Sequence, residues 1–593
     1  MTKKMAKAPT EVVLERLRTF YKHTVDSNQY TEWRKNARQA WDFYDGKQWT
    51  DQEERALLNL NQVPVVINEL APRIDSVVGA EVQSRTKVGY QPRSTSMEDK
   101  MLAEALTIVS TQVQEMNDAA EIKSSIFKSG LVCGVGCLEL RKQDDGTIKL
   151  VEISDDEVLY DPDAVQSDMR DSMYIGRSYL ADIDEVIKTY PDKKDQIESF
   201  VASAKERSGA SHFMSGSDEY DPDNYREYYD DKRNKMRIVK IQYKKPITAY
   251  RFFDTTGKEK ETFDKDTAQK FATEEAPVVE VTKNQIWEGV FSADIVLKHM
   301  PTDVQNGEFT QQLFVYKRRN RDGVPYGNVY PAIHPQRELN KRRSKMLHYL
   351  NVRRVVADAN AFENPDEARQ EAGRPDAFML KRRGTEVQMT ENLSLADSQF
   401  QLMQESKREI QAVTGIYDEF MGRQTNASSG VAISQRANNT ERSQSHVFSK
   451  LRFFSKQFGR SLLSMIQASM TQPVLVEIAD PENSEKMKTI ILNEVVETEG
   501  EEVVVRDIST GIYDVVVTEE PNYDAPPEAI RESLIQILGN GQLQVLGVPE
   551  LAKILIPHGS EQISAGVQQL LGASQPQAGA QEAAGVAATN TTP

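Results

Sequence analysis

The stretch YPAIHPQRELNKRRSKMLHYL at residues 330–350 decides the fold of this chain. Residues 335–354 predict a helix with few apolar positions, and a second polar helix is predicted over 396–412. Between them lies a compact segment with its own turn residues and a short apolar run, AFML (377–380), expected to be a strand. Helices of this kind bury little surface by themselves, so neighbours must support them. The pair therefore indicates an oligomer in which helix sides contact adjacent subunits.

The sequence before this pair changes from helical to strand-like spacing. Residues 10–24, 31–45 and 102–117 carry apolar side chains at helical intervals. Residues 130–320 contain short alternating runs separated by turn residues, which predicts a β-rich domain of antiparallel hairpins. An acidic run at 218–231 is expected to be a solvated loop.

After the pair, a Gly/Ser/Asn stretch at 415–430 precedes a long helix over about 431–470. Its apolar stripe is predicted to face a core, and it consists of Val447, Leu451, Phe454, Phe458, Leu462 and Met465. Strands return over 474–518, and Pro526-Pro527 opens a final helical unit. The predicted fold class is therefore α+β.

Composition limits the function. The 593 residues are 39% hydrophobic and 27% charged, with a net charge of −17, so a protein that coats DNA over a freely exposed surface is disfavoured. No run of 18 apolar residues predicts a membrane helix, and the first residues lack the apolar core of a signal peptide. Two cysteines, Cys133 and Cys137, make no disulfide framework and are expected to be small buried residues of a reduced protein.

One basic band stands out in this acidic chain. From Lys317 to Arg354 there are eleven basic residues and two acidic ones, a net charge of +9, and Lys381-Arg382-Arg383 follows nearby. Such a band can meet phosphates, or it can be a solvated helix face or the site of ion pairs between subunits. Consecutive residues on a helix spread around its axis, so Lys341, Arg342, Arg343 and Lys345 cannot all face one side.

Motifs of enzyme chemistry are missing from the sequence. There is no G-x-x-x-x-G-K-[ST], no H-E-x-x-H and no G-x-S-x-G, and the seven His have no second His or Cys at zinc spacing. Asp161-Pro-Asp163, followed by Asp168, is predicted to be a turn. The same carboxylates leave open a nucleic-acid enzyme that uses Mg²⁺. We assign no catalytic residue, no metal site and no cofactor.

Six stretches in order resemble the portal proteins of tailed bacteriophages, of the short-tailed (podovirus) type. They are the block from Trp33 to Trp49, PVVINELAPRIDSVVGAEVQSR (64–85, matched as a helix), YDPDA (160–164), YPAIHPQRELNKRRSKMLHYL (330–350), TGIYDEFMGRQTNASSGVAISQR (414–436) and YDVVVTEEPNYDAPPEAIRESLIQIL (513–538).

The resemblance implies a portal fold that assembles as a ring. Its parts would be N-terminal helices and a β-rich wing (1–330), a stem helix (331–356), an α/β clip (357–395), a second stem helix (396–412), a channel loop (413–430), a long wing helix with wing strands (431–525) and a helical crown (526–571). The Ala/Gln/Thr-rich tail (572–593) lacks core-forming residues, so it is expected to be disordered. Candidates for contact with DNA in the channel are Arg423, Gln424, Asn426, Lys341, Arg342, Arg343 and Lys345, and candidates for partner docking on the clip are Lys381, Arg382 and Arg383.

The resemblance also implies the role. About twelve subunits would form a ring at one capsid vertex, through which double-stranded DNA is packaged and ejected without sequence-specific contacts. Expected partners are the large terminase subunit, major capsid and scaffolding proteins, and head-completion or tail adaptor proteins. The protein would be assembled in the host cytoplasm, end in the virion, contact no membrane and hydrolyse nothing. The alternative is another neck or tail connector of the virion.

Twelve helices packed about 10 Å apart leave a lumen of roughly 28 Å, enough for a duplex. A conduit must also release the DNA, and each phosphate that a basic side chain neutralises raises the affinity for DNA. An acidic protein with few basic contacts suits that requirement.

Overall fold

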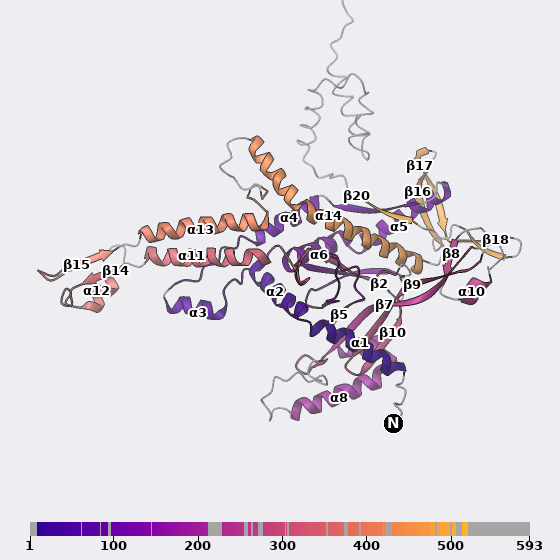
Figure 1. Ribbon diagram of the computed structural model, residues 1–593, viewed down its shortest axis with the longest axis horizontal. Coiled ribbons are helices and arrows are strands. Elements are labelled where there is room, and N and C mark those ends of the chain that lie inside the picture. Colours follow the sequence, from indigo (N-terminus) through magenta and orange to yellow (C-terminus); the bar gives the residue numbers. More distant parts are fainter. Residues whose placement is uncertain are drawn as a thin grey trace, which may run out of the picture. The chain divides into compact units, whose positions relative to one another are not determined.

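The computed structural model describes residues 9–519, with gaps at 61, 84, 93–96, 144, 211–227, 254–258, 263–264, 271–276, 303, 305–306, 352–353, 373–377, 391–392, 419, 422–429, 471–472, 481–482, 499–500 and 506–512. Except for Glu519, these residues belong to one compact unit. The predicted acidic loop lies mostly outside the described residues, and the predicted crown and tail lie wholly outside them. The mixed helix and strand content confirms the α+β class (Figure 1).

In the described part of residues 9–133, six helices precede the main sheets: α1 (Pro9–Val25), α2 (Asn28–Tyr44), α3 (Asp51–Asn59), α4 (Ala71–Gln83), α5 (Met97–Met116) and α6 (Ala119–Cys133). The expectation of a helix over 64–85 was wrong in its first part, because residues 62–69 are extended and α4 begins only at Ala71. Trp33 of α2 is fully buried, donates its indole N–H to the Cys133 carbonyl at 3.0 Å, and contacts the ring of Tyr160. Aromatic packing thus fixes α2 on the β-rich part.

The largest sheet has the order β10-β9-β7-β5-β4, with β6 and β8 also paired to β7. Its strands are β4 (Val158–Tyr160), β5 (Tyr174–Asp182), β6 (Tyr229–Asp230), β7 (Lys235–Phe253), β8 (Glu259–Thr262), β9 (Val279–Ser292) and β10 (Ile295–Pro301), and every pair in it is antiparallel. Two of the short alternating runs predicted within 130–320, RIVKIQY (237–243) and AYRFF (249–253), were expected to be separate strands. They form one strand, β7, because β9 pairs along it past Pro246.

A three-stranded sheet, β11-β2-β3, packs beneath α6. It consists of β2 (Val135–Lys142), β3 (Ile148–Ile153) and β11 (Gln311–Val315). A Cβ on Gly136 would lie 2.3 Å from the Ile126 carbonyl oxygen, so only glycine permits this approach of strand to helix. A Gly-rich strand was expected to hold both cysteines, but Cys133 ends α6 and only Cys137 lies in β2. Both thiols are buried, as expected. Short strands β12 (Lys317–Arg318) and β13 (Pro325–Tyr326) lead on to the predicted helix pair.

The two polar helices form an antiparallel hairpin, α11 (Ile333–Asn351) and α13 (Leu393–Thr414), as Figure 1 shows. Between them lie β14 (Arg354–Ala357), α12 (Pro365–Glu371) and β15 (Val387–Thr390). The run AFML is not a strand: its described part, 378–380, has no regular structure, and Phe378 and Leu380 are exposed. β14 pairs with β15 instead.

The long helix α14 (Gly430–Ser469) buries the whole predicted stripe from Val447 to Met465. Strands β16 (Val474–Asp480), β17 (Asn483–Leu492), β18 (Glu494–Thr498), β19 (Glu501–Val505) and β20 (Tyr513–Glu519) follow, and β20 pairs with β1 (Thr86–Pro92) near the other end of the sequence. Among the described residues, none of the helices is both long and apolar enough to cross a membrane.

Candidate functional site at the base of the helical hairpin

A row of polar side chains on α11 holds the extended segment 62–69. Gln336, Asn340 and Ser344 are spaced four apart and buried. Ser344 Oγ accepts from the Val65 N–H at 3.0 Å, and Asn340 Oδ1 accepts from the Ile67 N–H at 3.0 Å. Gln336 accepts from the Glu69 N–H at 3.3 Å and donates to the Ile67 carbonyl at 2.5 Å.

The distance between every fourth residue of α11 matches the distance between every second residue of the extended segment, which explains the regular pairing. Four helical residues rise about 6.0 Å, and two extended residues rise about 6.6 Å. Successive turns of α11 therefore meet alternate residues of the segment. This backbone would otherwise leave amides unsatisfied against the helix, and the side chains take the place of a neighbouring strand.

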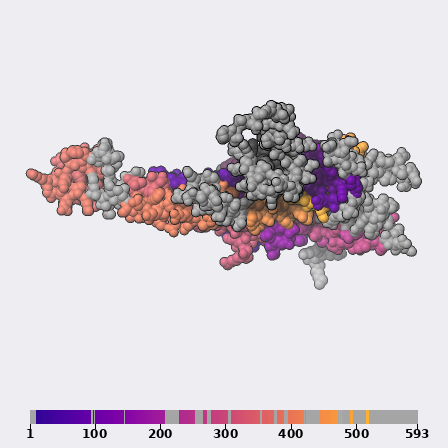
Figure 2. Space-filling model, turned by 90° about the horizontal axis from the view of Figure 1, so that it is seen from above, coloured from indigo at the N-terminus to yellow at the C-terminus, as the bar shows by residue number. Residues whose placement is uncertain are grey.

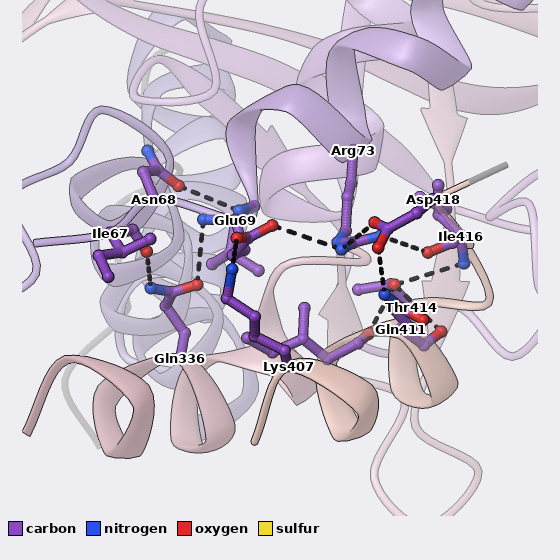
Figure 3. Close-up of polar contacts among 12 residues, drawn as sticks. Ile67, Asn68, Glu69, Arg73, Gln336, Lys407, Gln411, Thr414, Ile416 and Asp418 are labelled. Carbon is purple, nitrogen blue, oxygen red and sulfur yellow. Dashed lines mark hydrogen bonds and ion pairs between the residues drawn. The ribbon is translucent and has the colours of Figure 1, made fainter. Parts of the chain in front are cut away.

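A buried arginine joins this segment to the end of the hairpin (Figure 3). Arg73 of α4 is 1% exposed, and its guanidinium donates to the Ile416 carbonyl at 2.7 Å and to the Asp418 carboxylate at 2.9 Å. It also lies 3.4 Å from Glu69, whose other carboxylate oxygen pairs with Lys407 of α13 at 2.8 Å. The charges form one chain, Lys407–Glu69–Arg73–Asp418, across three parts of the sequence.

The residues after α13 are therefore fixed from several sides. Gln411 donates to the second oxygen of Asp418 at 2.8 Å. The Thr414 carbonyl accepts from Asn328 at 3.1 Å and from Gln444 of α14 at 3.3 Å. We call residues 414–418 the loop root, because they lie at the start of the channel loop predicted over 413–430. The loop candidates Arg423, Gln424 and Asn426 lie outside the described residues.

The four basic candidates on α11 point in different directions. Lys341 and Lys345 are exposed, whereas Arg342 and Arg343 are half-buried. Lys341 pairs with Glu53 of α3 at 3.2 Å, and Arg342 pairs with Glu338 at 2.7 Å and donates to Gln399 of α13. Burial acts to raise the pKa of Glu53, but bonds from Thr50 and Lys341 outweigh it and hold that pKa below its usual value. Part of the basic band is thus neutralised within the chain.

The three clip candidates lie together on the surface. Lys381, Arg382 and Arg383 are all exposed, beside the exposed Phe378 and Leu380. Lys381 donates to the Thr385 carbonyl at 3.1 Å, and the Arg382 N–H donates to the Ala361 carbonyl at 2.9 Å. The turn that follows contains Gly384, whose φ of +90° favours glycine.

The Asp161-Pro-Asp163 prediction of a turn is confirmed. Asp161 is buried, and its carboxylate accepts from the backbone N–H groups of Asp163 at 3.1 Å and Met173 at 2.8 Å. Asp168 pairs instead with Arg170 at 2.8 Å. The structure brings Asp161 and Asp163 together with His23, not with Asp168.

Sequence reasoning missed the residues that organise the hairpin base. The i, i+4, i+8 spacing of Gln336, Asn340 and Ser344 marks one face of a helix, but nothing local indicates its partner. The other available signal was Arg73, because a charged residue within the mostly apolar helix APRIDSVVG indicates a buried charge that needs a partner.

A comparison with protein-family models defines the class as a bacteriophage portal protein. The matching model is described as Phage P22-like portal protein and covers residues 21–592, so the chain belongs to this family. This confirms the resemblance stated above. Portal proteins are structural components of the phage particle. No curated protein matches the chain.

Proposed function

We propose that about twelve copies of this chain form a ring at a single capsid vertex, which serves as the conduit for packaging and ejecting double-stranded DNA. The family match over nearly the whole chain carries this proposal. The large terminase subunit docks on the ring during filling, and head-completion or tail adaptor proteins take its place afterwards. Capsid and scaffolding proteins surround it in the virion.

The hairpin surface supports contact with other copies. α13 exposes Leu395 (48%), Phe400 (47%), Leu402 (36%) and Val413 (45%), and α11 exposes Leu350 (51%). Figure 2 shows the molecule from above, and in this view α13 forms part of the uncovered surface of the hairpin. Several large apolar side chains on one element are typical of a protein-protein contact. We assign 331–356, which includes α11, and 396–412, which lies within α13, as the stem helices. We assign 357–395 as the clip, 413–430 as the channel loop, 1–330 and 431–525 as the wing, and 526–571 as the crown.

The charges of the hairpin support a channel that binds DNA only weakly. Lys341 and Arg342 are paired within the chain, so they contribute less to phosphate binding than their number implies. Of the four basic candidates on α11, Arg343 and Lys345 have no ion pair among the described residues. Arg343 and Lys345, together with Arg423, Gln424 and Asn426 of the loop, are our candidates for backbone contacts. Lys381, Arg382 and Arg383 are our candidates for partner docking.

Averaged electron micrographs of the purified chain, with light scattering for mass, test this function. We expect rings of about twelve subunits with a central hole. Leu402→Lys should shift the mass towards monomer, whereas Glu405→Lys, on an exposed position of the same helix, should not. A chain that stays monomeric at every concentration and salt would contradict the proposal, and tubes or fibres would favour a tail connector.

A further inference from the structure

Three metal-binding side chains meet where α1 ends on the β4–β5 turn. His23 lies in the last turn of α1, and Asp161 and Asp163 belong to the turn. One donor atom from each residue lies within 4.8 Å of the other two. None of these side chains takes part in the hairpin base or in the proposed ring contacts.

The spacing of the imidazole and one carboxylate fits coordination of a common ion. His23 Nε2 lies 3.4 Å from Asp163 Oδ2. A tetrahedral zinc ion with bonds of about 2.0–2.1 Å separates its ligand atoms by about 3.4 Å. The Asp163 side chain is 80% exposed, so it can adjust to an ion without disturbing the core.

Neighbouring hydroxyls orient the imidazole. Thr24 Oγ1 lies 3.2 Å from the carbonyl oxygens of Phe20 and Tyr160, and either oxygen can accept its proton. In that arrangement Tyr174 donates to Thr24 at 3.0 Å, and the phenol oxygen accepts from His23 Nδ1–H at 2.8 Å. The lone pair of His23 is then on Nε2, the nitrogen that lies 3.4 Å from Asp163 Oδ2. A second group that fixes the tautomer is typical of histidine ligands.

The buried carboxylate is held in place as well. Both oxygens of Asp161 accept backbone N–H bonds, and each keeps a lone pair for a further partner. Two carboxylates and a neutral imidazole carry a charge of about −2, which balances a divalent ion.

We propose that His23, Asp161 and Asp163 bind one divalent transition-metal ion of the zinc class, with water completing its coordination. Imidazole favours zinc over magnesium and calcium, which prefer sites built of oxygen alone. The ion would join α1 to the turn between β4 and β5. This site is separate from the proposed channel function.

Binding of Zn²⁺ to the metal-stripped, full-length protein tests the site by calorimetric titration. We expect about one Zn²⁺ per chain, and a loss of at least tenfold in affinity for His23→Ala and Asp163→Asn. Tyr174→Phe should lose about tenfold, because it removes the group that orients the ligand. Mg²⁺ and Ca²⁺ should bind much more weakly than Zn²⁺.

Asp294→Asn is the matched control, since Asp294 pairs with Arg18 of the same helix and lies outside the cluster. It should bind Zn²⁺ like the unmodified protein. Circular dichroism of each variant separates lost binding from lost folding, and Asp163→Asn, at an exposed position, keeps the test valid if other variants unfold. Absence of stoichiometric Zn²⁺ binding, or equal affinity in His23→Ala, would overturn the proposal and leave an ion pair between His23 and Asp163.

Discussion

The guanidinium of Arg73 lies 2.9 Å from the carboxylate of Asp418, a residue 345 positions later in the chain. The same guanidinium bonds to the Ile416 carbonyl and pairs with Glu69, which in turn pairs with Lys407 of the hairpin. α4 and the loop root are thus joined directly by Arg73, and α13 is joined to them through Glu69 and Lys407. A change in the position of α13 would act on the loop root through this contact.

Replacing Arg73 with Met should loosen the loop root. It removes one partner from a buried charged network, which typically costs about 3–5 kcal/mol. Hydrogen exchange of residues 414–418 should become markedly faster, while that of β7 and β9 changes little. Arg85→Met is the control, because Arg85 and Glu121 form a more exposed pair at 3.5 Å. Unchanged exchange at the loop root would show that the Arg73 contacts are dispensable.

Replacing Asn340 with Leu should release the extended segment from α11. The Ile67 N–H would lose its acceptor, and a buried unsatisfied amide costs about 1–3 kcal/mol. We expect faster hydrogen exchange at residues 65–69 and a lower unfolding temperature. Lys345→Leu, on the exposed side of the same helix, should leave exchange in this segment unchanged. Equal effects of the two changes would argue against the polar row as the anchor.

Two helical glycines should respond to alanine in opposite ways. A Cβ at Gly459 of α14 would lie 2.5 Å from Val88 and 2.7 Å from Val515, so Gly459→Ala should destabilise the packing of α14 on β1 and β20. Gly79 of α4 has no heavy atom within 4 Å of its would-be Cβ, so Gly79→Ala should stabilise by about 0.5–1 kcal/mol. Thermal unfolding of both variants checks this, and stabilisation by Gly459→Ala would contradict it.

The stability of the β-rich part should fall in acid because of Glu139. Burial acts to raise the pKa of this carboxyl, but the charges of Lys240, Arg141 and Arg177 outweigh it and lower the pKa to about 2. Its unfolded pKa is near 4.3. A depressed native pKa adds stability above the unfolded value, and that stability is lost as the pH falls from about 4.3 to 2.

Unfolding midpoints measured across this range should therefore decrease less steeply in Glu139→Gln than in the unmodified protein. Glu280→Gln, at an exposed position of β9, provides the control and should keep the original slope. An identical acid slope in Glu139→Gln would show that other carboxyls dominate.

Local sequence patterns were enough to predict several helices and the turn at Asp161. The stripe from Val447 to Met465 predicts α14, and the sparse apolar positions of 335–354 predict the exposed hairpin, because helical periodicity is a property of neighbouring residues. The turn at Asp161 forms because its side chain bonds to its own backbone two residues on. Six ordered stretches were also enough to identify the family.

Only the tertiary structure decided what those elements contact. Residues 62–69 are extended because Gln336, Asn340 and Ser344, far away in the sequence, supply their hydrogen-bond partners. The strand β7 continues past Pro246 because β9 pairs with both halves. Arg73 contacts Asp418, and His23 contacts Asp163, although the residues of each pair are far apart in the sequence. Local periodicity does not predict such long-range contacts. Such contacts depend on burial and on the geometry of distant partners, so single residues give no signal for them until the chain has folded.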